Sequence, residues 1–151
     1  MTVKRILSGK GNEVLTIEPT APLAAATKLM SERRFGALVV TGADHRIVGI
    51  ISERDIVRAL VRSEPILGEA IGAIMTRDVI VGTSQDDLVA VGTTMTEHRI
   101  RHLPIVEGGR LLGIVSLGDV VKAQRDQYQG EVDTLQFQIL NEEDVKAPRV
   151  S

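Results

Sequence analysis

The chain has 151 residues, of which 43% are hydrophobic and 25% are charged, so it can bury one ordinary core and is expected to fold as a soluble globule. Its net charge of −2 gives no overall attraction to nucleic acid or to an anionic membrane, and no apolar run approaches the roughly 20 residues of a membrane span. The absence of cysteine excludes disulfides and thiolate metal sites and is typical of a reducing compartment, so we expect a cytoplasmic protein with neither a nucleic-acid nor a membrane partner.

The first half of the chain predicts elements in the order β-α-β-β-α. A short apolar segment at 14–17 indicates a strand, and apolar residues at helical spacing over 23–30 indicate a helix. The continuous apolar runs at 37–40 and 47–51, separated by a polar turn, predict two further strands. The last of these strands leads directly into a second helix that begins near Ser52.

The second half repeats this order. A shift of 65 residues aligns the first strand and first helix of the two copies, and a shift of 64 aligns GIISERDI with GIVSLGDV. The repeat predicts strands at 79–81, 103–106 and 111–115 and a first helix over 88–95. Between the copies, an apolar linker predicts one helical turn at 71–75.

Neither copy is expected to fold alone, because a unit of about 47 residues buries too little surface. The sequence therefore predicts an α/β (α+β) fold in which two tandem β-α-β-β-α repeats pack pseudo-symmetrically through their sheets. We divide the chain into a first repeat with its lead-in at 1–62, a linker at 63–76, a second repeat at 77–126, and a C-terminal helix and tail at 127–151.

Both repeats contain Gly, two apolar residues, Ser, two residues and Asp, which places Ser52 before Asp55 and Ser116 before Asp119. One interpretation is a capping box, in which hydroxyl and carboxylate satisfy amides at the start of a helix. The other is a ligand site, because a helix N-terminus attracts phosphate and a carboxylate can accept both hydroxyls of a ribose. The pattern alone leaves both interpretations open.

The tandem plan, the segments GIISERDI and GIVSLGDV, and RHLPIV and MTRDVI in the second copy resemble a pair of cystathionine-β-synthase (CBS) domains, or Bateman module, of the stand-alone bacterial type. The resemblance covers about residues 6–125. It implies a regulatory module, not an enzyme, that senses an adenosyl nucleotide (AMP, ADP, ATP or NAD) in clefts between the repeats, without any catalytic cofactor. It further implies signalling to a separate effector protein by conformational change.

The resemblance also assigns roles to residues of two clefts. In the first cleft, Asp55 would hold the ribose, and in the companion cleft Asp119 would do so. The phosphates would contact Ser52, Arg54, Ser116, Arg101 and His102. The base pockets would use Ile50, Thr76, Val79 and Ile100 in the first cleft, and Ile114, Val14, Phe35 and Gly36 in the second.

The two clefts are unequal, because Gly118 stands where the first copy has Arg54. Whether one or both clefts bind is therefore open. His45 and His98 are expected in solvent, and with no Cys and three scattered His the sequence predicts no metal site.

Homodimers through the CBS helices are a further implication, for which Val57, Ala59, Leu60, Val120 and Val121 could serve either as interface or as core. After residue 126, apolar residues at helical spacing predict an additional helix that packs on the module or on a second subunit. Two alternative functions remain open, namely a dimerisation or interaction scaffold that needs no ligand and a cryptic enzyme.

Overall fold

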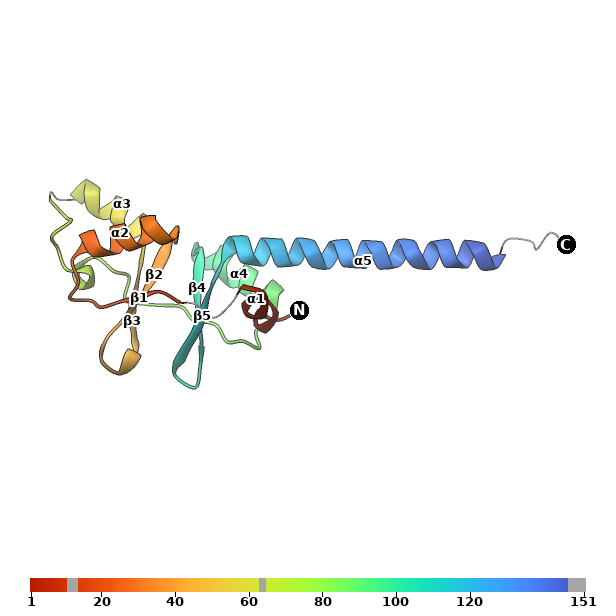
Figure 1. Ribbon diagram of the computed structural model, residues 1–151, viewed down its shortest axis with the longest axis horizontal. Helices are drawn as coiled ribbons and strands as arrows, with labels where there is room; N and C mark the ends of the chain where they lie inside the picture. Colours follow the sequence, from red (N-terminus) through yellow and green to blue (C-terminus); the bar gives the residue numbers. More distant parts are fainter. Residues whose placement is uncertain (11–13, 63–64, 147–151) are drawn as a thin grey trace.

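The computed structural model describes residues 1–10, 14–62 and 65–146, apart from the side chains of Asp144 and Lys146. Two small α/β repeats lie side by side with their sheets facing one another, and one long helix extends away from them (Figure 1). The predicted fold class is confirmed.

The first repeat comprises β1 (Thr16–Ile17), α2 (Leu23–Arg33), β2 (Ala37–Thr41), β3 (Ile47–Ser52) and α3 (Glu53–Arg62). Its sheet has the order β1-β2-β3, in which β1 is parallel to β2 and β2 is antiparallel to β3. All five residues of β2 are buried, as the continuous apolar run predicts for a central strand covered on both faces.

The second repeat comprises α4 (Leu88–His98), β4 (His102–Glu107), β5 (Arg110–Ser116) and α5 (Leu117–Lys146). Strands β4 and β5 form an antiparallel two-stranded sheet. The strand predicted at 79–81 is wrong, since only a single bridge between Gly82 and Ile105 occupies its place.

A tight turn explains the missing strand. The Asp86 carboxylate accepts hydrogen bonds from the amide and the hydroxyl of Thr83, both at 2.9 Å. The chain therefore turns directly after Gly82, and the apolar run before it is only partly covered, with Val81 47% exposed. A partly covered apolar segment here has the same sequence pattern as a buried strand.

The N-terminal helix α1 (Val3–Lys10) was not predicted, and it packs on the second repeat. Val3 and Leu7 lie in one buried cluster with Val91, Met95 and Val115. The helix that precedes the first repeat in the sequence therefore completes the core of the second repeat. In the linker, the predicted helical turn is present as a 3₁₀ turn at Ile71–Ala73.

A third buried cluster joins the two sheets. Ala37 and Val39 of β2 lie in it with Ile114 of β5, and Val14 and Ile50 pack against it. This shared face explains why the repeats fold as a pair. It also fixes the distance between the N-termini of α3 and α5, the helices that directly follow β3 and β5.

The glycines of the two repeated motifs are needed for close packing. A Cβ added at Gly49 would lie 2.5 Å from Met75 Sδ and 2.9 Å from the Thr76 carbonyl oxygen. A Cβ added at Gly113 would lie 2.7 Å from Leu7 Cδ2. Helix α1 thus covers the second motif in the way that the linker covers the first.

Helix α5 continues without a break beyond the second repeat, so the additional C-terminal helix predicted from the sequence is the outer part of α5. Its first turns pack on α4, β5 and α1. In the described parts of the chain, no helix has the combination of length and apolar character that a membrane crossing requires.

Candidate functional site

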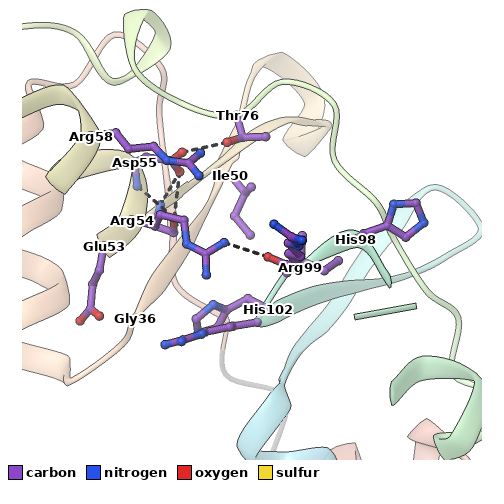
Figure 2. Close-up of a pocket in the computed structure, with 13 residues that line it drawn as sticks. Gly36, Ile50, Glu53, Arg54, Asp55, Arg58, Thr76, His98, Arg99 and His102 are labelled. Carbon is purple, nitrogen blue, oxygen red and sulfur yellow. Dashed lines mark hydrogen bonds between the residues drawn. The ribbon is translucent and has the colours of Figure 1, made fainter. Parts of the chain in front are cut away.

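A cavity of about 410 Å³ lies between the two repeats and is lined by both. The first repeat contributes the end of β3 and the first turns of α3, and the second contributes the end of α4 and the start of β4 (Figure 2). Its lining residues are Gly36, Ile50, Ser52, Glu53, Arg54, Asp55, Arg58, Thr76, His98, Arg99, Ile100, Arg101 and His102.

The capping box predicted at the start of α3 is present. The Ser52 amide and hydroxyl donate to Asp55 Oδ2 at 2.9 and 3.0 Å, and the Asp55 amide donates to Ser52 Oγ at 3.3 Å. The other oxygen, Asp55 Oδ1, accepts a hydrogen bond from Thr76 Oγ1 at 2.9 Å. The cap therefore holds the carboxylate still at the cavity wall.

Capping does not use up the acceptor capacity of this carboxylate. An ionised carboxylate offers about four lone-pair sites, and Oδ1 accepts one hydrogen bond from Thr76. The exposed Thr76 side chain can rotate to donate elsewhere. Asp55 can thus cap α3 and still accept from a ligand hydroxyl, so its two interpretations are compatible.

Arginine side chains dominate the electrostatics of the cavity. Arg54, Arg58, Arg99 and Arg101 line it, against the carboxylates of Glu53 and Asp55. Arg54 spans the gap between the repeats and donates from Nη1 to the Arg99 carbonyl oxygen at 2.9 Å (Figure 2). An excess of fixed positive charge in a concave site attracts an anion.

Arg101 and His102 border this cavity and also a neighbouring pocket at the start of α5. As strand alternation predicts, the two differ, with Arg101 exposed and His102 half-buried. Burial and the nearby Lys10 charge lower the pKa of His102 below the ordinary 6.5, against the opposite effect of Glu53 and Asp119. His102 is therefore neutral at pH 7.

The corresponding carboxylate of the second repeat has a different partner. Asp119 forms the same cap, with 2.9 Å from the Ser116 amide to Oδ2 and 3.0 Å from its own amide to Ser116 Oγ. In addition, Lys10 Nζ donates to Asp119 Oδ2 at 2.6 Å and to the Ile114 carbonyl at 3.0 Å. At Asp119 the additional donor, Lys10, therefore binds the same oxygen as the cap amide, whereas at Asp55 Thr76 binds the other oxygen, Oδ1.

The pKa of Asp119 reflects this environment. Burial acts to raise the pKa, but the hydrogen bonds from Lys10 and Ser116 and the Lys10 charge outweigh it, so the pKa lies below its ordinary value. The carboxylate is ionised and already paired with a cation. Asp119 thus has a cation beside it, where Asp55 has the neutral Thr76 hydroxyl.

The structure brings together most of the residues predicted for the first cleft, because Ser52, Arg54, Asp55, Ile50, Thr76, Ile100, Arg101 and His102 all line one cavity. Val79 lies outside this lining. Gly36, expected in the companion cleft, also lines this cavity, and a Cβ there would lie 3.2 Å from the His102 ring.

The other residues predicted for the companion cleft are more dispersed. Val14 and Ile114 belong to the cluster between the sheets, and Phe35 packs against the core of the first repeat. Ser116 lines the pocket at the start of α5, whereas Asp119 lines another pocket with Lys10.

Sequence reasoning did not select Glu53, Arg58, His98 or Arg99 for the site. His98 is exposed, as expected, but it also borders the cavity. Arg99 adopts the left-handed conformation, with φ 54°, that ends α4, and this turn directs its carbonyl toward Arg54. Arg34, at the equivalent position at the end of α2, adopts the same conformation, with φ 57°. Among the described residues, His, Asp and Glu form no cluster that could hold a metal ion.

Comparisons with known proteins agree with this architecture. The family model for the CBS domain matches residues 4–62 and 71–126. The crystal structure of the CBS-domain containing protein ATU1752 from Agrobacterium tumefaciens has a TM-score of 0.79 at 37% identity, covering 82% of this chain and 99% of that one.

Two further comparisons concern length and ligands. An uncharacterized 17.7 kDa protein of Acidianus ambivalens is 36% identical over 83% of this chain. The chain spans 73%, 41% and 56% of the length of the first three curated relatives that it matches. The CBS domain pair of protein MJ0100, solved in complex with 5′-methylthioadenosine and S-adenosyl-L-methionine, has a TM-score of 0.75 at 26% identity, covering 84% of this chain and 98% of that one.

The two segments that match the family model coincide with the two structural repeats and together cover most of the chain. This chain therefore belongs to the CBS domain family and forms a CBS domain pair.

Proposed function

We propose that this CBS pair is a regulatory module that binds an adenosyl nucleotide, AMP, ADP, ATP or NAD, in the cavity between its repeats. The observation that carries the proposal is the cavity itself, whose volume of about 410 Å³ lies in the usual range for small-ligand sites of about 300–1,000 Å³. It combines one fixed carboxylate, four arginines and apolar side chains at a boundary between two folding units.

Each part of a nucleotide has a suitable counterpart in this cavity. Asp55 is held in place to accept the ribose hydroxyls, and Ile50 and Ile100 offer apolar surface to a base. Arg54, with the amides at the start of α3, offers charge and donors to phosphate. The complex of the MJ0100 domain pair with two adenosine-containing ligands supports the choice of an adenosyl compound.

A ligand in this position would act on the contact between the repeats. In the structure, Arg54 donates across the gap to the Arg99 carbonyl. A phosphate would compete for the same guanidinium and replace that contact by one through the ligand. The loss of this direct contact would shift the relative orientation of the repeats, which a separate effector protein would read.

We assign a binding role and not a catalytic one. The Ser52 amide, the Ser52 hydroxyl and Thr76 fix the Asp55 carboxylate and leave it acceptor capacity for a ligand hydroxyl, a role that requires no proton transfer. This favours a sensor over the enzyme alternative.

Homodimerisation through the CBS helices is also proposed. Ala59 and Val120 are buried and belong to the core, whereas Val57, Leu60 and Val121 are exposed. Exposed apolar residues on α3 and α5 are typical of an interaction surface.

Thermal unfolding in the presence of AMP, ADP, ATP, NAD and S-adenosylmethionine tests the proposed function. A ligand present at about 100 times its dissociation constant stabilises the folded state by about 2.7 kcal/mol. A shift with at least one nucleotide, recovered unchanged after incubation, is expected. No shift with any of them would favour the scaffold, and conversion of a nucleotide would favour the enzyme.

A further inference from the structure

The outer part of α5 carries an apolar stripe that nothing in the structure covers. Every described side chain from Arg125 to Glu143 is exposed, and this part of the helix extends away from both repeats (Figure 1). Tyr128, Val132, Leu135 and Ile139 are between 46% and 66% exposed.

These four residues fall on one face of the helix. They follow one another at spacings of four, three and four residues, which is the heptad pattern of a coiled-coil seam. Helix α1 packs near Asp126 and Gly130, about half a turn away from the stripe, so it leaves the stripe free. Helices in water gain most of their stability from packing such a face against a partner. The stripe therefore requires a partner helix.

Charged residues at the two ends of the stripe indicate which partner fits. The same spacing places Arg125 one step before Tyr128 and Glu142 one step after Ile139. The seam thus has a cation at one end and an anion at the other, so it is complementary to a reversed copy of itself. Beside the seam, Lys122 likewise places a cation near the first end and Glu143 an anion near the second.

We infer that the stripe pairs with the same stripe of a second copy of this chain in an antiparallel coiled coil. With the centre of the pair between Val132 and Leu135, Val132 lies opposite the partner's Leu135 and Tyr128 lies opposite the partner's Ile139. Arg125 then lies opposite the partner's Glu142. The overlap from Arg125 to Glu142 is about 27 Å long.

The parallel arrangement is disfavoured by the same residues. It would place Arg125 beside the partner's Arg125 and Glu142 beside the partner's Glu142, so like charges would meet at both ends of the seam. Within the described residues Arg125 forms an exposed ion pair with Asp126 at 3.7 Å, which is weak and easily exchanged.

Two substitutions of the same residue type test whether the stripe is the interface. Leu135→Asp lies in the seam and Leu140→Asp lies outside it, although both leucines are exposed and belong to the same helix. Light scattering coupled to size exclusion should show that Leu135→Asp halves the mass of the assembly, or raises its dissociation constant at least about 10-fold. Leu140→Asp should leave both unchanged. Equal behaviour of the two variants would overturn the pairing, as would a wild-type chain that is monomeric at high concentration.

Cysteine crosslinking tests the orientation and is unusually clean because the chain has no cysteine of its own. A mixture of Tyr128→Cys and Ile139→Cys chains should form disulfide-linked heterodimers, while each variant alone should not crosslink, since identical positions lie about 16 Å apart. Crosslinking of each variant with itself would show a parallel pair and overturn the inference.

An exchange of charges gives a second check of the orientation. Arg125→Glu should weaken the pair, and the double variant Arg125→Glu with Glu142→Arg should restore it.

Discussion

Replacing Asp55 by Asn separates the ligand-binding role of this carboxylate from its structural one. An Asn side chain has nearly the same shape and keeps one oxygen that can accept from the Ser52 amide, which lies 2.9 Å from Asp55 Oδ2 in the wild-type chain. It loses the charge and half of the acceptor capacity offered to a ribose. Hydrogen bonds to a charged acceptor contribute about 1.5–3 kcal/mol each, so losing one should weaken nucleotide binding about 10- to 100-fold.

Asp119→Asn provides the matched control. Asp119 forms the same cap with Ser116, at 2.9 and 3.0 Å, and also has the ion pair with Lys10. Both variants therefore lose part of a helix cap, which costs about 1 kcal/mol of folding stability. Only Asp55→Asn changes the open cavity.

Isothermal titration calorimetry at a temperature where both variants are folded is the appropriate assay. Asp55→Asn should lower the affinity for the best nucleotide, and Asp119→Asn should change it less than about threefold. Unchanged binding by Asp55→Asn, or an equal loss in both variants, would refute the assignment of Asp55 to the ribose.

Four further predictions concern Lys10, His102 and Gly49. Lys10→Ala removes the donor that lies 2.6 Å from Asp119, so the pKa of the Asp119 carboxyl should rise relative to the wild-type chain; titration of the carboxyl by NMR measures this, and an unchanged pKa would count against the ion pair. Burial and Lys10 lower the pKa of His102, so as the pH falls the unfolded chain protonates this histidine before the folded chain does. The contribution of His102 to folding stability is therefore greatest above pH 6.5 and declines as the pH falls through the folded-state pKa. Urea titrations should show this decline, and His102→Gln should remove it. A phosphate beside His102 would raise that pKa again, so calorimetric affinity for ATP should increase from about pH 8 to about pH 6, and a flat profile would place the phosphates elsewhere. Gly49→Ala, whose Cβ would lie 2.5 Å from a sulfur and 2.9 Å from a backbone oxygen, should lower the free energy of unfolding by about 1–3 kcal/mol, while Gly130→Ala, with no atom within 4 Å, should raise it by up to about 1 kcal/mol.

The repeat made most of the fold predictable. Because GIISERDI and GIVSLGDV have the same spacing, one capping box predicted the other, and both are present at nearly equal distances. The long apolar runs predicted the paired strands within one or two residues. Local pattern was sufficient for these features because each depends on neighbours in the chain.

Features that depend on distant contacts were not predictable. Nothing in VKRILSGK indicates that Leu7 will pack on Gly113 or that Lys10 will bond to Asp119, because those residues are about a hundred positions away. Gly36 was assigned to the companion cleft but lines the first one, since a repeat register does not say which of two related clefts a residue faces. Arg99 enters the site through its backbone carbonyl, which no side-chain motif reports.

Direct titration of the wild-type chain with AMP, ADP, ATP and NAD tests the central claim, that the arginine-lined cavity holding Asp55 binds a nucleotide. We predict saturable binding of at least one of them, with about one molecule per chain and a marked loss in Asp55→Asn. A folded chain that binds none of the four would contradict the claim.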